Sequence, residues 1–231
     1  MGTCVASFFL CAFIHFLFLL VREPLWDPFC GSGTILAEAL LARAAKHFDY
    51  NLLVNQLTDP PKYFSFQQWN TFPIDAYQTW FNSQPKRQDF LAYLDSIPQN
   101  HFVGSDISES VTRSAEKNWA ALTNKAKCGN YFVGDFEKVA PSVLAKFSNP
   151  PVIFSNLPYG VRLNDHLNSI YNRLARFIHE YKGKYKDFYV LDGSSGNHFL
   201  SISSTYNIRW NSLAQFSNGY RKLFYFFFKY G

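Results

Sequence analysis

A glycine turn between a short apolar run and a strongly helical segment constrains the fold of this chain most. Pro24 to Asp27 (PLWD) predicts a strand, and TILAEALLARAAK, from Thr34 to about Lys46, predicts a helix with Thr34 as its N-cap. The sequence PFCGSG joins the two segments. Strand, tight glycine turn and helix in this order are typical of an open α/β sheet. We therefore expect parallel strands with helices on both faces.

Later apolar runs continue the pattern. Further strands are predicted at residues 101–106, 130–135, 151–155, 187–191 and 223–229, the last buried on both faces because it is continuously apolar. Ser108 is expected to cap a helix over residues 108–122, and another helix is expected across Tyr77 to Leu94. Residues 50–75 show no clean periodicity, so an irregular insertion is predicted at about 50–98.

Composition favours one folded domain without disulfides or metal. The chain has 231 residues, 48% of them hydrophobic, and its net charge of +5 modestly favours a polyanionic partner. Two short basic clusters, one at Lys182, Lys184 and Lys186 and one at Arg221 and Lys222, are each interpreted as a solvated face. The four cysteines have no metal-ligand spacing and predict reduced thiols in an intracellular, cytoplasmic protein.

The apolar stretch from Val5 to Val21 is treated separately. Its length is at the bottom of the transmembrane range, and only a very short connection separates it from the first strand. We favour a helix packed on the sheet, with a membrane segment as the alternative. The expected division is 1–23 for this helix and 24–231 for the main domain.

The glycine turn predicts the ligand. Gly31 and Gly33 allow the backbone to approach a ligand closely, and the helix that follows can receive a carboxylate. The turn has neither the third glycine of a dinucleotide site nor the Gly-Lys-Ser/Thr of a phosphate loop. Asp27 immediately before it suits an amine-bearing ligand. S-adenosylmethionine carries an ammonium, a sulfonium and a carboxylate close together, so this cofactor is expected, with Phe29 and Thr34 among its contacts.

Two further acids follow predicted strands. Asp106 is expected to accept hydrogen bonds from the ribose hydroxyls, with Ile107 beside it. Asp135 is expected to accept from the adenine amino group, and Phe136 to line the adenine pocket. The alternative for each acid is a helix N-cap, and for Phe136 a place in the core.

A second motif, SNLPYG, follows the strand at 151–155 and points to an amine target. The side-chain oxygen of Asn156 and the carbonyl of Leu157 can each accept one N–H of an exocyclic amine. Pro158 fixes the turn, and Tyr159 can stack on the base. Asn156 is also counted among the cofactor contacts. The expected chemistry is methyl transfer governed by positioning rather than by a strong base.

With these motifs the chain resembles the catalytic domain of the THUMP-associated RNA guanine-N2 methyltransferases. The resemblance rests on EPLWDPFCGSGTILAEALL, FSFQQW, HFVGSDIS, YFVGD and SNLPYGVRL in the family's order. It implies a Rossmann-like class I fold with a mostly parallel seven-stranded sheet, and rRNA or tRNA as substrate. Leu157 stands where the family usually has proline. No THUMP-like domain precedes Pro24, so we expect a separate RNA-binding subunit or a truncated product.

The leading hypothesis is therefore an S-adenosylmethionine-dependent RNA guanine-N2 methyltransferase. The nearest alternative is an adenine-N6 methyltransferase acting on RNA or DNA, because the amine-holding motif suits either base. A third hypothesis, motivated by Leu157 and the missing domain, is a non-catalytic scaffold that binds the cofactor.

Overall fold

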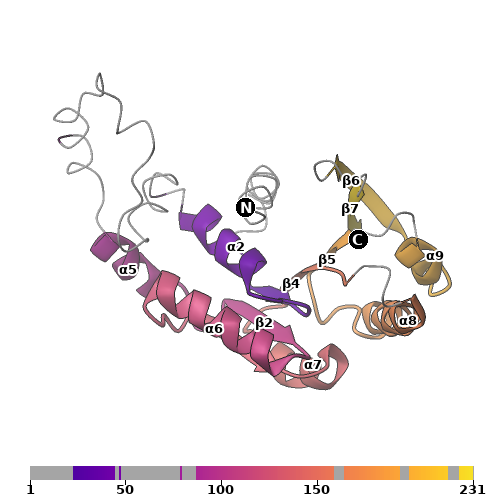
Figure 1. Cartoon of the computed structure of the whole chain (residues 1–231), viewed down its shortest axis with the longest axis horizontal. Helices are drawn as coiled ribbons and strands as arrows, with labels where there is room; N and C mark the ends of the chain where they lie inside the picture. Colours follow the sequence, from indigo (N-terminus) through magenta and orange to yellow (C-terminus); the bar gives the residue numbers. More distant parts are fainter. Residues whose placement is uncertain are drawn as a thin grey trace.

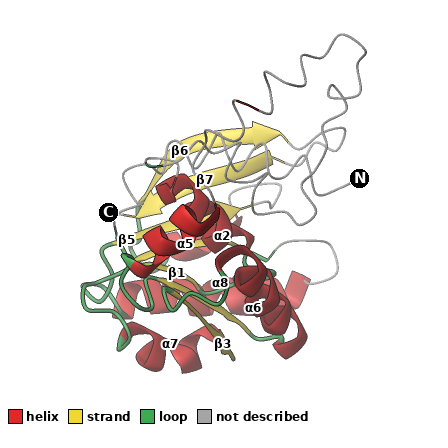
Figure 2. Ribbon diagram, turned by 90° about the vertical axis from the view of Figure 1, so that its left-hand side faces the viewer, coloured by secondary structure: helices red, strands yellow, loops and turns green. Residues whose placement is uncertain are grey.

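The strands form one mixed sheet in a computed structural model that describes residues 23–44, 47, 79, 87–158, 164–192, 198–217 and 224–230. The strands are β1 (Leu25–Asp27), β2 (Phe102–Asp106), β3 (Gly129–Val133), β4 (Val152–Asn156), β5 (Asp187–Asp192), β6 (Trp210–Ser217) and β7 (Phe224–Tyr230). Their order is β3-β2-β1-β4-β5-β7-β6, and Figure 2 shows them from β3 at one edge to β6 at the other. The strands β1 to β5 are parallel, whereas β7 is antiparallel to both of its neighbours.

Helices connect the parallel strands. They are α2 (Thr34–Ala44), α5 (Arg87–Asp95), α6 (Glu109–Thr123), α7 (Phe136–Leu144), α8 (Asn164–Glu180) and α9 (His198–Ser204). Figure 1 shows α2 and α6 close together, and α8 beside α9. The crossover from one parallel strand to the next requires such a helix, which buries one face of the sheet as it returns.

Alternation along each strand divides the core between the two faces of the sheet. Leu25 and Phe102 pack with α2, α5 and α6 in one cluster. The next residue of each strand, Trp26 and Val103, packs on the other face with α7, α8 and α9. Successive strand side chains point to opposite faces, so a strand covered on both sides is apolar throughout. Burying each large side chain stabilises the fold by roughly 1.5–3 kcal/mol.

The strands predicted from the sequence are confirmed with small shifts at their ends. Two details of the prediction are wrong. The helix α2 begins at Thr34, which is therefore its first helical residue rather than its N-cap. Strand β3 ends at Val133, two residues before Asp135. The helix predicted across Tyr77 to Leu94 agrees with α5 over its later part, where Phe90 and Leu94 pack into the core.

Other expectations are met in part or fall on residues outside the described ranges. Ser108 occupies the N-cap position of α6, but its side chain makes no capping bond. The Tyr77–Leu94 helix is described from residue 87 onward. The segment from Val5 to Val21 and the side chains of β7 lie outside the described residues. No helix among the described residues has the length and apolarity needed to cross a membrane.

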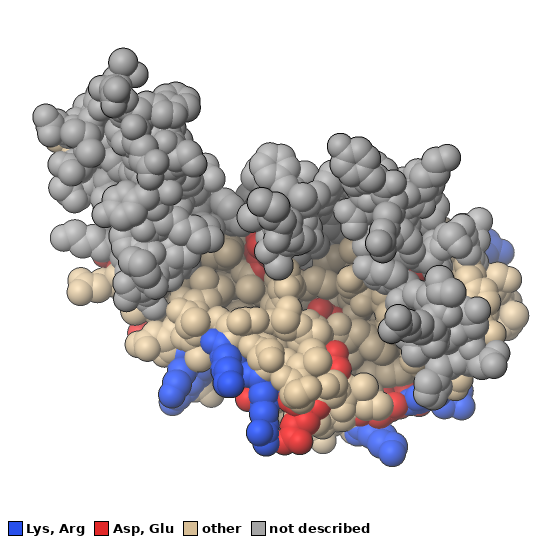
Figure 3. Space-filling model, in the orientation of Figure 1, with Lys and Arg blue, Asp and Glu red and all other residues tan. Residues whose placement is uncertain are grey.

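Lys and Arg side chains on the face drawn in Figure 3 lie along one rim and are interspersed with Asp and Glu. On the outer side of α6, Arg113 pairs with Glu109 at 2.6 Å. In the basic cluster near residue 184, Lys186 pairs with Glu23, also at 2.6 Å. These exposed pairs fit the interpretation of that cluster as a solvated surface.

Candidate active site

The carboxyl ends of β1 and β4 form the point at which the strand order reverses. The two strands are neighbours, and from them the sheet continues to β2 and β3 in one direction and to β5 in the other. In an open α/β sheet the connections diverge at this point and leave a crevice where ligands bind. Asp27 is the last residue of β1, and Asn156 is the last residue of β4.

The glycine turn after β1 has a backbone that favours glycine. Gly31 and Gly33 have φ angles of +53° and +82°. A Cβ on Gly33 would also lie 3.1 Å from the Tyr131 hydroxyl and 3.2 Å from the Ala115 Cβ. The N–H of Gly31 donates to Asp106 Oδ2 at 3.2 Å, which fixes the turn against the end of β2. The turn is therefore held close to the sheet with its backbone open to a ligand.

Asp27 is fully buried beneath this turn and has one unsatisfied oxygen. Its Oδ1 accepts hydrogen bonds from the Ser155 hydroxyl at 2.5 Å and from the Phe29 N–H at 3.1 Å. Its Oδ2 has no hydrogen-bond partner among the described residues. Burial raises the pKa of Asp27 to about 7. A buried carboxylate oxygen without a donor is costly, so the site favours a ligand that brings an N–H donor or a positive charge.

Asn156 presents a second unsatisfied acceptor at the end of the neighbouring strand. Its Oδ1 is buried and has no hydrogen-bond partner in the part of the chain that the structure describes. The turn that follows is anchored on both sides: the Leu157 N–H donates to Leu191 O at 2.9 Å, and Pro158 O accepts from the Tyr171 hydroxyl at 3.0 Å. The amide oxygen is thus available in a fixed turn for an N–H that is supplied from outside the protein.

Two exposed apolar side chains lie at the ends of β2 and β3. Ile107 is 73% exposed and Val133 is 50% exposed, and they are the exposed large hydrophobic side chains of the described residues. Between them, Asp106 accepts from Gly31 N–H through Oδ2 and from Ser108 N–H through Oδ1. Asp106 and Val133 are paired in register, so an acid and an apolar surface adjoin on this edge.

Asp135 and Phe136 lie at the start of helix α7. Asp135 is the N-cap of α7 and accepts from Glu137 N–H at 3.1 Å, which is the alternative interpretation of this acid. It also pairs with Arg173 of α8. Phe136 is 4% exposed and packs in the core, with its ring centroid 5.2 Å from that of Phe29. Capping and ion pairing give Asp135 a structural role at the edge of the expected adenine pocket.

The structure brings the predicted residues to one edge of the sheet. Those described follow the ends of β1, β2, β3 and β4: Asp27, Phe29, Gly31, Gly33, Thr34, Asp106, Ile107, Asp135, Phe136, Asn156, Leu157 and Pro158. Tyr159 lies outside the described residues. Sequence reasoning missed Ser155, Val133, Tyr171 and Arg173. Ser155 could have been found, because it directly precedes Asn156 within the motif, whereas the other three depend on long-range contacts.

Comparison with known families identifies the class of this site. A family model described as RMKL-like, methyltransferase domain, matches residues 11–193. The chain belongs to this family. Its fold is the Rossmann-like fold of class I methyltransferases, and its cofactor is S-adenosylmethionine.

Individual relatives share this region of the domain. A ribosomal RNA large subunit methyltransferase K/L from Colwellia psychrerythraea is 30% identical over 175 residues, 73% of this chain and 21% of that protein. The protein of the same name from Psychromonas ingrahamii is 28% identical over 148 residues, 64% of this chain and 18% of that protein. This chain therefore matches about a fifth of the length of these relatives.

Solved structures share the fold. SMU.472, a methyltransferase crystallised with SAH, superposes with a TM-score of 0.63 at 17% identity, over 96% of this chain and 51% of that chain. A Listeria monocytogenes protein named as a predicted N6-adenine-specific DNA methylase gives a TM-score of 0.60 at 20% identity, over 96% of this chain and 50% of that chain.

The residues at the switch point fit S-adenosylmethionine. The unpartnered Oδ2 of Asp27 can accept from an ammonium group, and the backbone of the glycine turn leaves room for the methionine moiety. Asp106 carries a carboxylate at the end of β2, the position that binds ribose hydroxyls in related sheets.

Proposed function

We propose that this chain methylates an exocyclic amino nitrogen of a base in RNA, and that the base is guanine. The observation that carries this proposal is the buried, unpartnered Oδ1 of Asn156 at the end of β4. It lies on the strand next to β1, where Asp27 has an unpartnered oxygen of its own. Two unsatisfied acceptors on adjacent strands match a pair of ligands that both bring N–H groups.

The amine-holding role follows from the chemistry of the target. The lone pair of an exocyclic amine is delocalised into the ring, so the nitrogen is a poor nucleophile until its geometry changes. Asn156 Oδ1 and the Leu157 carbonyl can each accept one N–H and favour a pyramidal nitrogen. S-adenosylmethionine supplies an electrophilic methyl group on its sulfonium. The contribution of the protein is therefore mainly to orient the reacting groups. Such orientation can lower the activation barrier by a large part.

Stacking of an aromatic side chain on the target base can offset the cost of extruding that base. Tyr159 follows Pro158 directly, and an aromatic ring there can stack on an extruded base, stabilising it by roughly 1–3 kcal/mol. A paired base first has to leave its helix, which costs a few kcal/mol, so a single-stranded or loop nucleotide is the favoured substrate.

The names of the relatives support RNA as the substrate, and the sequence resemblance supports guanine as the base. The proteins from Colwellia and Psychromonas are named as ribosomal RNA large subunit methyltransferases, and the FSFQQW element of the insertion matches the RNA guanine-N2 family.

Adenine-N6 methylation is the second candidate. The motif here reads Asn-Leu-Pro-Tyr, with leucine where the guanine family usually has proline, and a protein of the same fold is named as an N6-adenine methylase.

Replacing Asn156 with alanine tests the amine-holding role. In Asn156→Ala, methyl transfer to RNA is expected to fall roughly 100-fold or more because the target nitrogen loses its orientation. The dissociation constant for S-adenosylmethionine should stay within a few-fold of the wild type. Both quantities can be measured with radiolabelled cofactor and by calorimetry.

A matched control is Asn130→Ala. Asn130 has the same side chain, but its amide is satisfied by Asn100 Oδ1 at 3.0 Å and by the Tyr131 N–H at 2.9 Å. This control should keep its transfer rate. Retained turnover in Asn156→Ala would remove Asn156 from the reaction, and cofactor binding without any transfer by the wild type would favour a scaffold instead.

A further inference from the structure

Tyr171 connects helix α8 to the turn that carries the amine-holding motif. Its side chain is fully buried, and its hydroxyl donates to the carbonyl of Pro158 at 3.0 Å. The bond spans the segment between β4 and α8, so it ties the turn to a helix of the core. A buried tyrosine hydroxyl needs a partner, and here the partner is the backbone of the motif itself.

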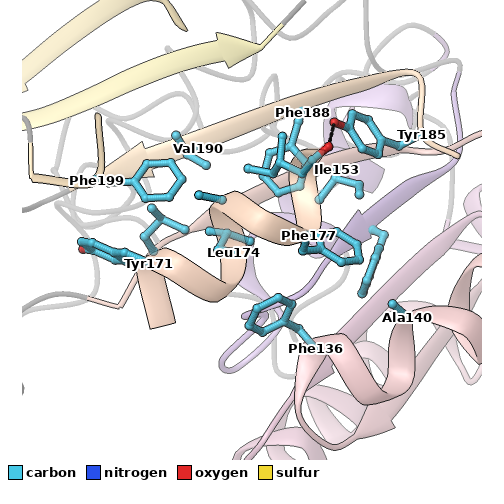
Figure 4. Close-up of a cluster of buried hydrophobic side chains, with 14 of the residues drawn as sticks. Phe136, Ala140, Ile153, Tyr171, Leu174, Phe177, Tyr185, Phe188, Val190 and Phe199 are labelled. Carbon is cyan, nitrogen blue, oxygen red and sulfur yellow. Dashed lines mark hydrogen bonds between the residues drawn. The ribbon is translucent and has the colours of Figure 1, made fainter. Parts of the chain in front are cut away.

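The ring of Tyr171 is fixed by its neighbours. Its centroid lies 5.2 Å from that of Phe199 at an interplanar angle of 71°, and 5.8 Å from the His198 ring. Figure 4 shows Tyr171 facing Phe199 at one end of the buried cluster, with Tyr185 at the other end. Since aromatic packing leaves the ring little freedom, the position of the hydroxyl is set before any substrate binds.

Hydrogen bonds therefore hold the peptide groups on both sides of the Leu157 carbonyl. On one side the Leu157 N–H donates to Leu191 O of β5, and its side chain is 1% exposed in the core. On the other side Tyr171 holds the carbonyl of Pro158, whose ring fixes its own φ angle. With both flanking peptide groups held, the direction of the intervening carbonyl is restricted, and so is the backbone from which Asn156 extends.

We propose that Tyr171 is a positioning residue for methyl transfer: its hydroxyl fixes the turn so that Asn156 Oδ1 and the Leu157 carbonyl converge on one amino nitrogen. This inference rests on the proposed function. Because reactions governed by orientation are sensitive to small displacements, loss of the bond lowers kcat more than it weakens cofactor binding. Tyr171 itself does not contact the reacting atoms.

The experiment compares Tyr171→Phe with Tyr185→Phe. Each substitution removes one hydroxyl that donates to a backbone carbonyl in the same cluster, since Tyr185 donates to Ile178 O at 2.8 Å. Both variants should lose a similar, small amount of thermal stability. In Tyr171→Phe, kcat should fall by about three- to tenfold, the factor expected for one net hydrogen bond, with KM for S-adenosylmethionine within twofold. Tyr185→Phe should keep the wild-type kcat.

The outcomes separate this inference from the proposed function. An active wild type with an unchanged kcat in Tyr171→Phe overturns the role of Tyr171 alone. Equal losses of kcat in both variants also overturn it, because they reveal a general effect of weakened packing. A wild type that transfers no methyl group to RNA overturns the proposed function, and this inference with it.

Discussion

At the scale of single residues, the burial of Asp27 is costly to the fold. Its carboxyl group is fully buried, and only one of its oxygens has hydrogen-bond donors in the structure. Natural proteins rarely leave such an atom unsatisfied without a role for it. The Ser155 hydroxyl bonds to the other oxygen, and Ser155 directly precedes Asn156, so one buried contact joins the ends of β1 and β4.

The raised pKa of Asp27 predicts a pH dependence of stability without ligand. Burial raises its pKa from 3.8 to about 7, so the folded state holds the proton more tightly than the unfolded chain. The contribution of Asp27 to the free energy of unfolding is fully present below pH 3.8 and is lost as pH rises through about 7. His101 acts in the opposite direction: burial lowers its pKa from 6.5 to about 4, so its contribution is present above 6.5 and lost as pH falls through 4.

The variant Asp27→Asn isolates the first contribution. Relative to the wild type, its free energy of unfolding should rise between pH 4 and pH 8 by up to about 4 kcal/mol, the equivalent of about three pKa units. Urea unfolding at each pH measures the difference. The exposed Asp95 of α5 offers the matched control, because Asp95→Asn makes the same exchange at the protein surface rather than in the core. A difference that does not change with pH would contradict the buried, titrating Asp27.

At the scale of elements, helix α8 organises the face of the sheet on which the motif turn rests. Tyr171 reaches the turn after β4, and Arg173 reaches the first turn of α7. Arg173 pairs with Asp135 and, at 2.6 Å, with Glu137, and its guanidinium lies 5.3 Å from the centroid of the Phe136 ring. Burial raises the pKa of Asp135, but the hydrogen bond and charge of Arg173 outweigh this and hold it below its ordinary value.

Replacing Arg173 with methionine tests this junction. Arg173→Met keeps an unbranched apolar stem but removes charge-assisted bonds from a half-buried position, so the free energy of unfolding should fall by about 1–2 kcal/mol. Arg113→Met removes an exposed i,i+4 pair with Glu109 and should cost about 0.3–0.5 kcal/mol. Urea unfolding at pH 7 measures both. Equal losses would mean that Arg173 forms only an ordinary surface pair.

At the scale of the whole molecule, the features that could be predicted from the sequence are those that leave a local pattern of residues. The glycine turn and the motif at 155–160 placed the site, and most parallel strands were recognised because their apolar runs end in Asp, Ser or Asn. Helix α8 was not predicted, although Leu167, Tyr171, Leu174 and Ile178 follow the spacing of a buried helical face. Strand β6 was also not predicted, because the polar residues in its sequence, WNSLAQFS, interrupt the alternation of apolar and polar residues that indicates a strand.

The remaining differences arise from contacts between distant parts of the chain. From its neighbours in sequence, Asp135 could end a strand or cap a helix. In the fold it caps α7 and pairs with Arg173 of α8. The same holds for Tyr171, which reads as an ordinary core tyrosine in sequence. Long-range hydrogen bonds of this kind leave no local pattern, so only the three-dimensional structure reveals them.

The most direct test of the account is the identity of the methylated nucleoside. The purified chain is incubated with total RNA and S-adenosylmethionine that carries a labelled methyl group, and the RNA is then digested and its nucleosides are separated by mass. The account predicts label in N2-methylguanosine for the wild type and its loss in Asn156→Ala. Label in N6-methyladenosine, or no labelled nucleoside at all, would contradict it.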